Sequence, residues 1–442
     1  MMLSVKYVLI HLALLSFLAS CVHNPMYTSQ LASSQNQVKT LLYEDMEYED
    51  RIKTVLFYPM GTSPNSVLNP PVVNRKEPVP LVLEFDDLGK NYANYYVKLY
   101  HCNANWTRSN YTDLQIVSDF NETLISNYSS SINTKVRFTH YSFVVPRVRL
   151  SGNYLLVVYR NGDQSDLILS RKFIVFDPMV QIKDNVQFAT DVKERDTKQQ
   201  VGFTIGFNST LDIPNPQDVT VMIRQNYRWD NAVVLRQPLY IQFDKMQLDY
   251  NFFDGQNRFN GGNEFRFFDI RNLRMKGMNV AQYATTDSSN TVYLVTDRNR
   301  NSLTYSEQID INGRFVVQRF ESDNPSLEAD YANVYFQLQT APDFEGDIYL
   351  AGQMTDWRLK PKFKLEYDSI SGTYIKNILL KQGYYNYQYC LVHKNGTDWN
   401  YFEGDYSLTE NFYDIIVYYR PPNQFNDMVI GYANLNYRGR AR

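Results

Sequence analysis

The sequence contains few of the residues on which metal sites and disulfide frameworks depend. Its 442 residues include three cysteines and five histidines. This count excludes a disulfide-rich scaffold, which needs several cysteine pairs in a short chain. Beyond the N-terminal segment only Cys102 and Cys390 remain. A disulfide between them stays open, but we favour two buried thiols that pack as small apolar side chains.

The chain also lacks an excess of charge and a long apolar run after its N-terminus. It has 44 basic and 47 acidic residues, so it carries no electrostatic footprint for nucleic acid. No later stretch is apolar enough to span a bilayer of about 30 Å. No sustained helical period occurs, and the length is too great for a single core. The length therefore predicts roughly two to four domains.

Catalytic signatures are missing as well. The sequence holds no HExxH motif, GxSxG elbow, phosphate loop or dinucleotide fingerprint. Asp86-Asp87 could form a calcium or acid/base pair, but its place before Leu88-Gly89 favours a turn. His101-Cys102 could form a thiol–imidazole couple, although neighbouring strand residues point to opposite faces. We therefore predict a non-enzymatic protein with no cofactor and no metal.

The N-terminus, in contrast, carries an export signal. Lys6 precedes an apolar run over residues 8–18, which ends in Leu18-Ala19-Ser20-Cys21. The run is too short to span a bilayer and is typical of a lipoprotein signal peptide covering residues 1–20. Cys21 would carry the lipid that holds the protein on a membrane. The alternative is an ordinary secretory signal with a chance cysteine. No acidic cluster follows Cys21, which favours the periplasmic leaflet.

Aromatic residues are abundant, with 36 Tyr and 26 Phe. Tyrosine suits half-buried strand positions and also protein interfaces, and composition does not separate these uses. Short alternating segments such as residues 97–100 are separated by turn signals such as Ser151-Gly152-Asn153. The pattern predicts an all-β protein of tandem immunoglobulin-like or early-set β-sandwich domains.

The spacing of strands and breaks gives a predicted domain organisation. A tether over residues 21–42 follows the signal peptide and is rich in Ser, Gln and Asn. The N-terminal sandwich should span residues 43–178 and the middle all-β domain residues 179–326. A C-terminal early-set-like sandwich should span residues 327–422, where Pro421-Pro422 ends its last strand. Residues 423–442 are left as a tail.

One motif in the predicted C-terminal domain resembles a sugar site. Residues 346–357, 372–374 and 382–389 resemble the glycogen-binding or early-set sandwich attached to starch-acting enzymes. In that family a tryptophan stacks on a sugar face, and the resemblance assigns this role to Trp357, with Trp399 as a loose match for the second tryptophan. Gln388 stands where the family uses a lysine. We therefore favour the fold without the sugar ligand.

Segments spread over almost the whole chain resemble the plug protein family of the type IX secretion system. The most specific is His101-Cys102-Asn103-Ala104-Asn105-Trp106, which is similar to the family's His-Cys-Asp-Ala-Asp-Trp signature with both aspartates replaced. The other matching segments are residues 52–59, 83–88, 94–96, 120–122, 151–156, 171–173, 261–269, 381–387, 403–406 and 417–420.

The resemblance implies a function that the residues alone do not. Family members close the periplasmic mouth of the outer-membrane translocon barrel, so we expect that barrel as partner and a lipid-anchored location on the periplasmic face of the outer membrane. His101, Cys102, Trp106, Glu264 and Arg266 are signature positions with a structural role. The alternative is a glycan-binding lipoprotein that uses Trp357 and Trp399.

Overall fold

The computed structural model describes residues 39–439 apart from residues 62, 78, 208–210, 212, 214 and 423. The predicted signal peptide, Cys21 and most of the predicted tether lie outside these residues. The described residues form six sheets of mainly antiparallel strands, which enclose three main apolar cores. The prediction of an all-β chain of tandem β-sandwiches is therefore confirmed.

The first sandwich joins two sheets over a core of alternating side chains. In β5 (Tyr95–Cys102), Tyr95, Val97 and Leu99 are buried in this core while Tyr96 and Lys98 are less buried. One sheet contains β1 (Met46–Glu47), β10 (Leu167–Phe176), β9 (Gly152–Arg160), β5 and β6 (Thr123–Leu124), with β3 (Val72–Asn74) beside β10. The other contains β2 (Ile52–Pro59), β4 (Leu81–Asp87), β8 (Thr139–Val144) and β7 (Asn127–Ser130).

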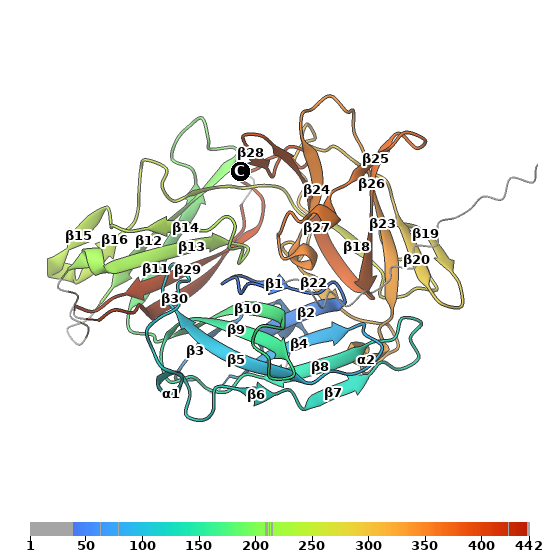
Figure 1. The fold of residues 1–442 in the computed structure, drawn as a ribbon. Helices are drawn as coiled ribbons and strands as arrows, with labels where there is room; N and C mark the ends of the chain where they lie inside the picture. Colours follow the sequence, from blue (N-terminus) through green and yellow to red (C-terminus); the bar gives the residue numbers. More distant parts are fainter. Residues whose placement is uncertain are drawn as a thin grey trace, which may run out of the picture. The chain divides into compact units, whose positions relative to one another are not determined.

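The middle sandwich takes strands from two distant parts of the chain. One sheet contains β11 (Gln181–Phe188), β12 (Lys198–Gly206), β16 (Gln247–Asp249), β15 (Tyr240–Gln242) and β17 (Arg258–Asn260). The other contains β14 (Val233–Leu235), β13 (Val219–Gln225), β29 (Asn411–Tyr419) and β30 (Met428–Tyr437). Figure 1 shows the dark red C-terminal strands β29 and β30 among the green strands β11–β13.

The third sandwich lies between these two parts in sequence. One sheet contains β18 (Arg266–Asp269), β27 (Gly383–His393), β22 (Phe315–Val317), β24 (Asp347–Ala351) and β28 (Gly396–Asp398). The other contains β19 (Val280–Thr285), β20 (Asn290–Leu294), β23 (Tyr331–Gln339), β26 (Thr373–Lys381), β25 (Glu366–Asp368) and β21 (Asp297–Arg298). Its core includes Phe268, Phe336 and Tyr387.

The helices of the described residues are single turns. The α-helical ones are α1 (Asp113–Ile116) and α2 (Pro325–Glu328), and the 3-10 turns are η1 (Pro64–Leu68), η2 (Pro216–Asp218), η3 (Phe243–Lys245), η4 (Gln353–Thr355) and η5 (Pro361–Phe363). None of the helices in this part of the chain is long and apolar enough to cross a membrane.

The sandwiches differ from the predicted domain boundaries. Strands β18–β22 belong to the third sandwich, although the prediction placed residues 179–326 in the middle domain. Strand β29 belongs to the middle sandwich rather than to the C-terminal one, and the predicted tail over residues 423–442 contains β30. The apolar pattern of a strand reports its burial but not its partner, which explains the error.

The N-terminal boundary also differs. The prediction ended the tether at residue 42, but Lys39 already binds the first sandwich. Its ammonium lies 2.6 Å from both Glu49 and Asp166. Residues 39–439 fall within one compact unit.

Candidate functional site

The signature residues His101 and Cys102 end β5, where the strand is buried on both faces. The His101 ring contacts Tyr111 and Tyr154 edge to face, each at 5.0 Å, and its Nε2 lies 3.2 Å from the Ser151 carbonyl oxygen. Burial lowers the pKa of His101. Gly152, at φ +154°, is required beside it, because a Cβ there would meet Nε2 at 2.1 Å.

The two thiols are buried and unreactive by environment. Cys102 and Cys390 are both free, and each is fully buried. Burial raises the pKa of each thiol to about 12, which leaves almost no thiolate near neutral pH. Cys102 contacts the Tyr100 carbonyl whereas His101 contacts Ser151. The two neighbouring residues therefore share no proton, as the strand alternation predicts.

Trp106 connects the first and middle sandwiches. It adopts a left-handed backbone conformation at φ 64° and packs edge-on against Trp229, with ring centroids 4.9 Å apart. The Lys172 ammonium lies over both rings, at 4.5 and 4.8 Å. Arg224 lies 4.0 Å over the Trp229 ring and donates from Nε to Asp414 at 3.0 Å. This signature tryptophan is thus part of an interface between sandwiches.

Glu264 and Arg266 lie where the chain passes from the middle to the third sandwich. Arg266 donates from Nε to Glu403 at 3.0 Å and from Nη1 to Asp297 at 2.9 Å. Glu264 accepts from the Tyr305 hydroxyl at 2.6 Å, and burial raises its pKa. These contacts join the segment after β17 to the segment before β29, which is how one chain enters and leaves the third sandwich.

The structure brings Trp357 and Trp399 together, with ring centroids 6.3 Å apart. A side chain that sequence reasoning did not single out lies against both rings: the Arg228 guanidinium is 4.0 Å from the Trp357 ring and 4.2 Å from the Trp399 ring. Arg228 follows β13 of the middle sandwich and is buried. Sugar stacking needs a free aromatic face, and this cation covers a face of each ring.

A second group missed from the sequence surrounds Asp86. Asp87 binds the Gly89 amide at 2.8 Å, as expected of a turn-forming residue. Asp86 instead accepts from the Lys381 ammonium at 2.6 Å and from the Tyr331 hydroxyl at 2.7 Å, and its other oxygen lies 2.8 Å from His140 Nδ1. Lys381 and Tyr331 belong to the third sandwich. Asp86 therefore forms a fully buried ion pair between sandwiches, not a turn.

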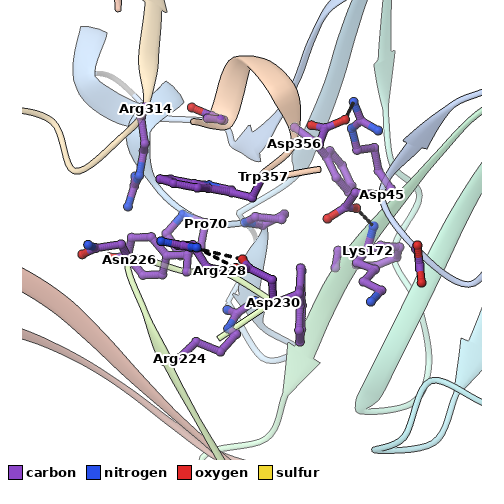
Figure 2. A pocket seen from close by; sticks show the side chains of 18 of the residues that line it. Asp45, Pro70, Lys172, Arg224, Asn226, Arg228, Asp230, Arg314, Asp356 and Trp357 are labelled. Carbon is purple, nitrogen blue, oxygen red and sulfur yellow. Dashed lines mark hydrogen bonds and ion pairs between the residues drawn. The ribbon is translucent and has the colours of Figure 1, made fainter. Parts of the chain in front are cut away.

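A cavity of about 490 Å³ is lined by residues of all three sandwiches. The first sandwich contributes Phe57 and Lys172. The middle sandwich contributes Arg224, which lies in β13, and Trp229, which follows that strand. The third sandwich contributes Trp357, which follows η4. Figure 2 shows Lys172, Arg224 and Trp357 around this cavity. The described residues contain no group of three or more His, Cys, Asp or Glu side chains placed to hold a metal ion.

Comparison with known proteins relates both the first sandwich and the whole chain to other proteins. Residues 52–177 match the family model described as "Type 9 secretion system plug protein 1st domain". Among solved structures, a hypothetical protein from Parabacteroides merdae is 30% identical, with a TM-score of 0.85, over 90% of this chain and 100% of that chain. The chain belongs to the family of that protein. No curated protein matches it.

These matches divide the signature residues into two groups. His101, Cys102 and Trp106 fall within the residues that match the plug first domain, which supports the predicted plug family. Glu264 and Arg266 lie outside that match but within a chain that is similar along most of its length to the Parabacteroides merdae protein. The matched domain is the first sandwich, and it supports a role related to type 9 secretion in the cell envelope.

Proposed function

We propose that this protein is a non-enzymatic plug, anchored by a lipid on Cys21 to the periplasmic face of the outer membrane, which binds and seals the translocon barrel of a type IX secretion system. The observation that carries this proposal is the match of residues 52–177 to the plug first domain. The lipobox at Leu18-Ala19-Ser20-Cys21 supplies the anchor.

The contacts between sandwiches suit this function. A pore wide enough for folded proteins needs a stopper whose parts do not move apart. Buried ion pairs join the first and third sandwiches at Asp86–Lys381, and Arg266–Glu403 braces the third against the segment that leads into β29. A rigid body loses little conformational entropy when it docks. The proposal therefore predicts a specific interface larger than about 1,000 Å².

A cross-linked pull-down tests the partner. The tagged protein would be expressed at its native level, cross-linked in whole cells, purified from gently solubilised outer membrane, and its partners identified by mass spectrometry. We expect the translocon barrel to be a major partner. A strain without the barrel gene is the matched control. Abundant tagged protein without any barrel would overturn the proposal.

The alternative function is glycan binding through Trp357 and Trp399. The observation in its favour is that the two rings lie close together. Because Arg228 covers a face of both rings, we expect no saturable binding of maltooligosaccharides at sugar concentrations of about 1 mM. A Kd of about 1 mM corresponds to a binding free energy of roughly −4 kcal/mol. Saturable binding that Trp357→Ala abolishes would place the alternative first.

A further inference from the structure

The cavity between the three sandwiches has the properties of a ligand site. Its volume of about 490 Å³ lies within the range of roughly 300–1,000 Å³ typical of small-molecule pockets. Its lining combines aromatic rings, including Trp229, Tyr227 and Trp357, with charged side chains. The proposed plug function assigns no role to this space.

Cations outnumber acids in the lining, and most of them are already paired. The cations are Arg171, Lys172, Arg224, Arg228, Arg314 and Arg358, and the acids are Glu44, Asp45, Asp230 and Asp356. Arg224 pairs with Asp414, Arg228 with Asp230, Arg358 with Glu44 and Arg171 with Glu47. The Lys172 ammonium is held over the Trp106 and Trp229 rings.

Among these six cations, Lys172 and Arg314 make no ion pair within the described residues, and Arg314 alone has a buried nitrogen without a hydrogen-bond partner. Its side chain is 9% exposed, its guanidinium makes no ion pair with a carboxylate of the described residues, and its Nη2 is buried without a hydrogen-bond partner. The guanidinium stacks on Tyr227, at 4.2 Å from the ring, and lies 6.0 Å from the Phe412 ring. Burial lowers the pKa of Arg314 to about 10. Figure 2 shows this side chain extending toward Asn226 and the Trp357 ring.

A buried, unpaired cation is costly to a folded protein, so its presence needs an explanation. A ligand that brings one negative charge would remove the cost. A planar carboxylate fits the fork of a guanidinium through two parallel hydrogen bonds. The single unpaired guanidinium, with four carboxylates already in the lining, matches a monoanion better than a dianionic phosphate.

We propose that the cavity binds a small organic acid, whose carboxylate pairs with Arg314 and whose apolar body fills the rest of the cavity. Binding of such a ligand would join residues of the middle and third sandwiches across the cavity. The ligand would stabilise the folded protein by an amount that rises with the logarithm of one plus its concentration divided by its Kd.

Calorimetric titration of the purified full-length protein with phenylacetate tests the proposal. Phenylacetamide has nearly the same shape but no charge, and inorganic phosphate is the second comparison. We expect saturable binding of phenylacetate, with phenylacetamide at least about tenfold weaker. No saturable binding of phenylacetate up to about 10 mM, equal affinity for the amide, or tighter binding of phosphate would each overturn the proposal.

Two variants locate the site. Arg314→Met should abolish phenylacetate binding, whereas Arg274→Met, at an exposed position outside the cavity, should leave it unchanged. Thermal unfolding without ligand separates a binding role from a structural one. Removal of an unpaired buried cation should keep or raise the Tm of Arg314→Met, and phenylacetate should raise only the Tm of the wild type and of Arg274→Met. A lower ligand-free Tm of Arg314→Met, with unchanged binding, would contradict the proposal.

Discussion

Asp86 shows how much a single buried carboxylate contributes to the contact between two sandwiches. It binds Lys381, Tyr331 and His140, and both it and Lys381 are 1% exposed. Asp86→Asn would leave the Lys381 ammonium buried without its counter-charge. We therefore expect a loss of roughly 3–5 kcal/mol in the free energy of unfolding, measured by chemical denaturation.

Asp119→Asn is the matched control, because Asp119 is exposed and surface substitutions usually change stability by less than about 0.5 kcal/mol. If Asp86→Asn were as stable as this control, the buried ion pair would not hold the sandwiches together.

His140 makes the stability of this contact depend on pH. Burial alone lowers the pKa of His140, but hydrogen bonds and ion pairs with Asp86 and Glu84 outweigh burial and raise it from 6.5 to about 9. The raised pKa means that the folded protein holds this proton more tightly than the unfolded chain. The linked stabilisation is therefore complete below pH 6.5 and is lost as the pH rises through about 9.

The expected size of this loss is on the order of 3 kcal/mol between pH 6.5 and 9.5. Other charged or titratable groups surround the cluster, namely Lys381, Tyr331 and Tyr58. Urea unfolding at a series of pH values measures the effect, and His140→Gln should flatten the dependence. His393→Gln, which leaves the Asp86 cluster intact, serves as the control. An unchanged slope in His140→Gln would show that another group controls it.

At the scale of the element, β30 distinguishes the observed fold from the predicted tail. Ile430 in this strand is fully buried in the middle core, whereas Asn436 on the same strand is exposed. Ile430→Ala should lower the free energy of unfolding by roughly 2–5 kcal/mol, and Asn436→Ala should change it by less than about 0.5 kcal/mol. Equal stability of the two variants would mean that β30 does not belong to the core.

Individual strands show what could be predicted from the sequence. Local alternation in β5 and the mostly apolar residues of β29 identified strands and a sandwich architecture correctly. The partner of a strand depends on contacts far along the chain, such as Val221 beside Val417, and no local pattern encodes them. The boundaries of the middle and third sandwiches were therefore wrong.

The candidate sites divide in the same way. The placement of His101 and Cys102 on opposite faces of a strand could be predicted, and so could the turn at Asp87. The insertion of Arg228 between two tryptophans and the pairing of Asp86 with Lys381 could not, because each joins residues more than a hundred positions apart. The sequence shows only that Arg228 directly precedes Trp229, which does not identify its partners.

At the scale of the whole molecule, the path of the chain ties the three sandwiches to one another. The third sandwich is inserted between β17 and β29 of the middle sandwich. The first sandwich contacts the other two through side chains such as the half-buried Trp106 and the buried Asp86. This arrangement fits a stopper that must stay intact while it closes a pore, which is the central claim of the proposed function.

The permeability of the outer membrane tests that claim most directly. In a strain without this gene, an idle translocon would stand open, and uptake of a large antibiotic or dye normally excluded by the outer membrane should increase. Deletion of the translocon gene as well should restore the barrier, and export of secreted proteins should persist at least in part in the single mutant. An unchanged permeability in the single mutant, or a leak that persists in the double mutant, would contradict the account.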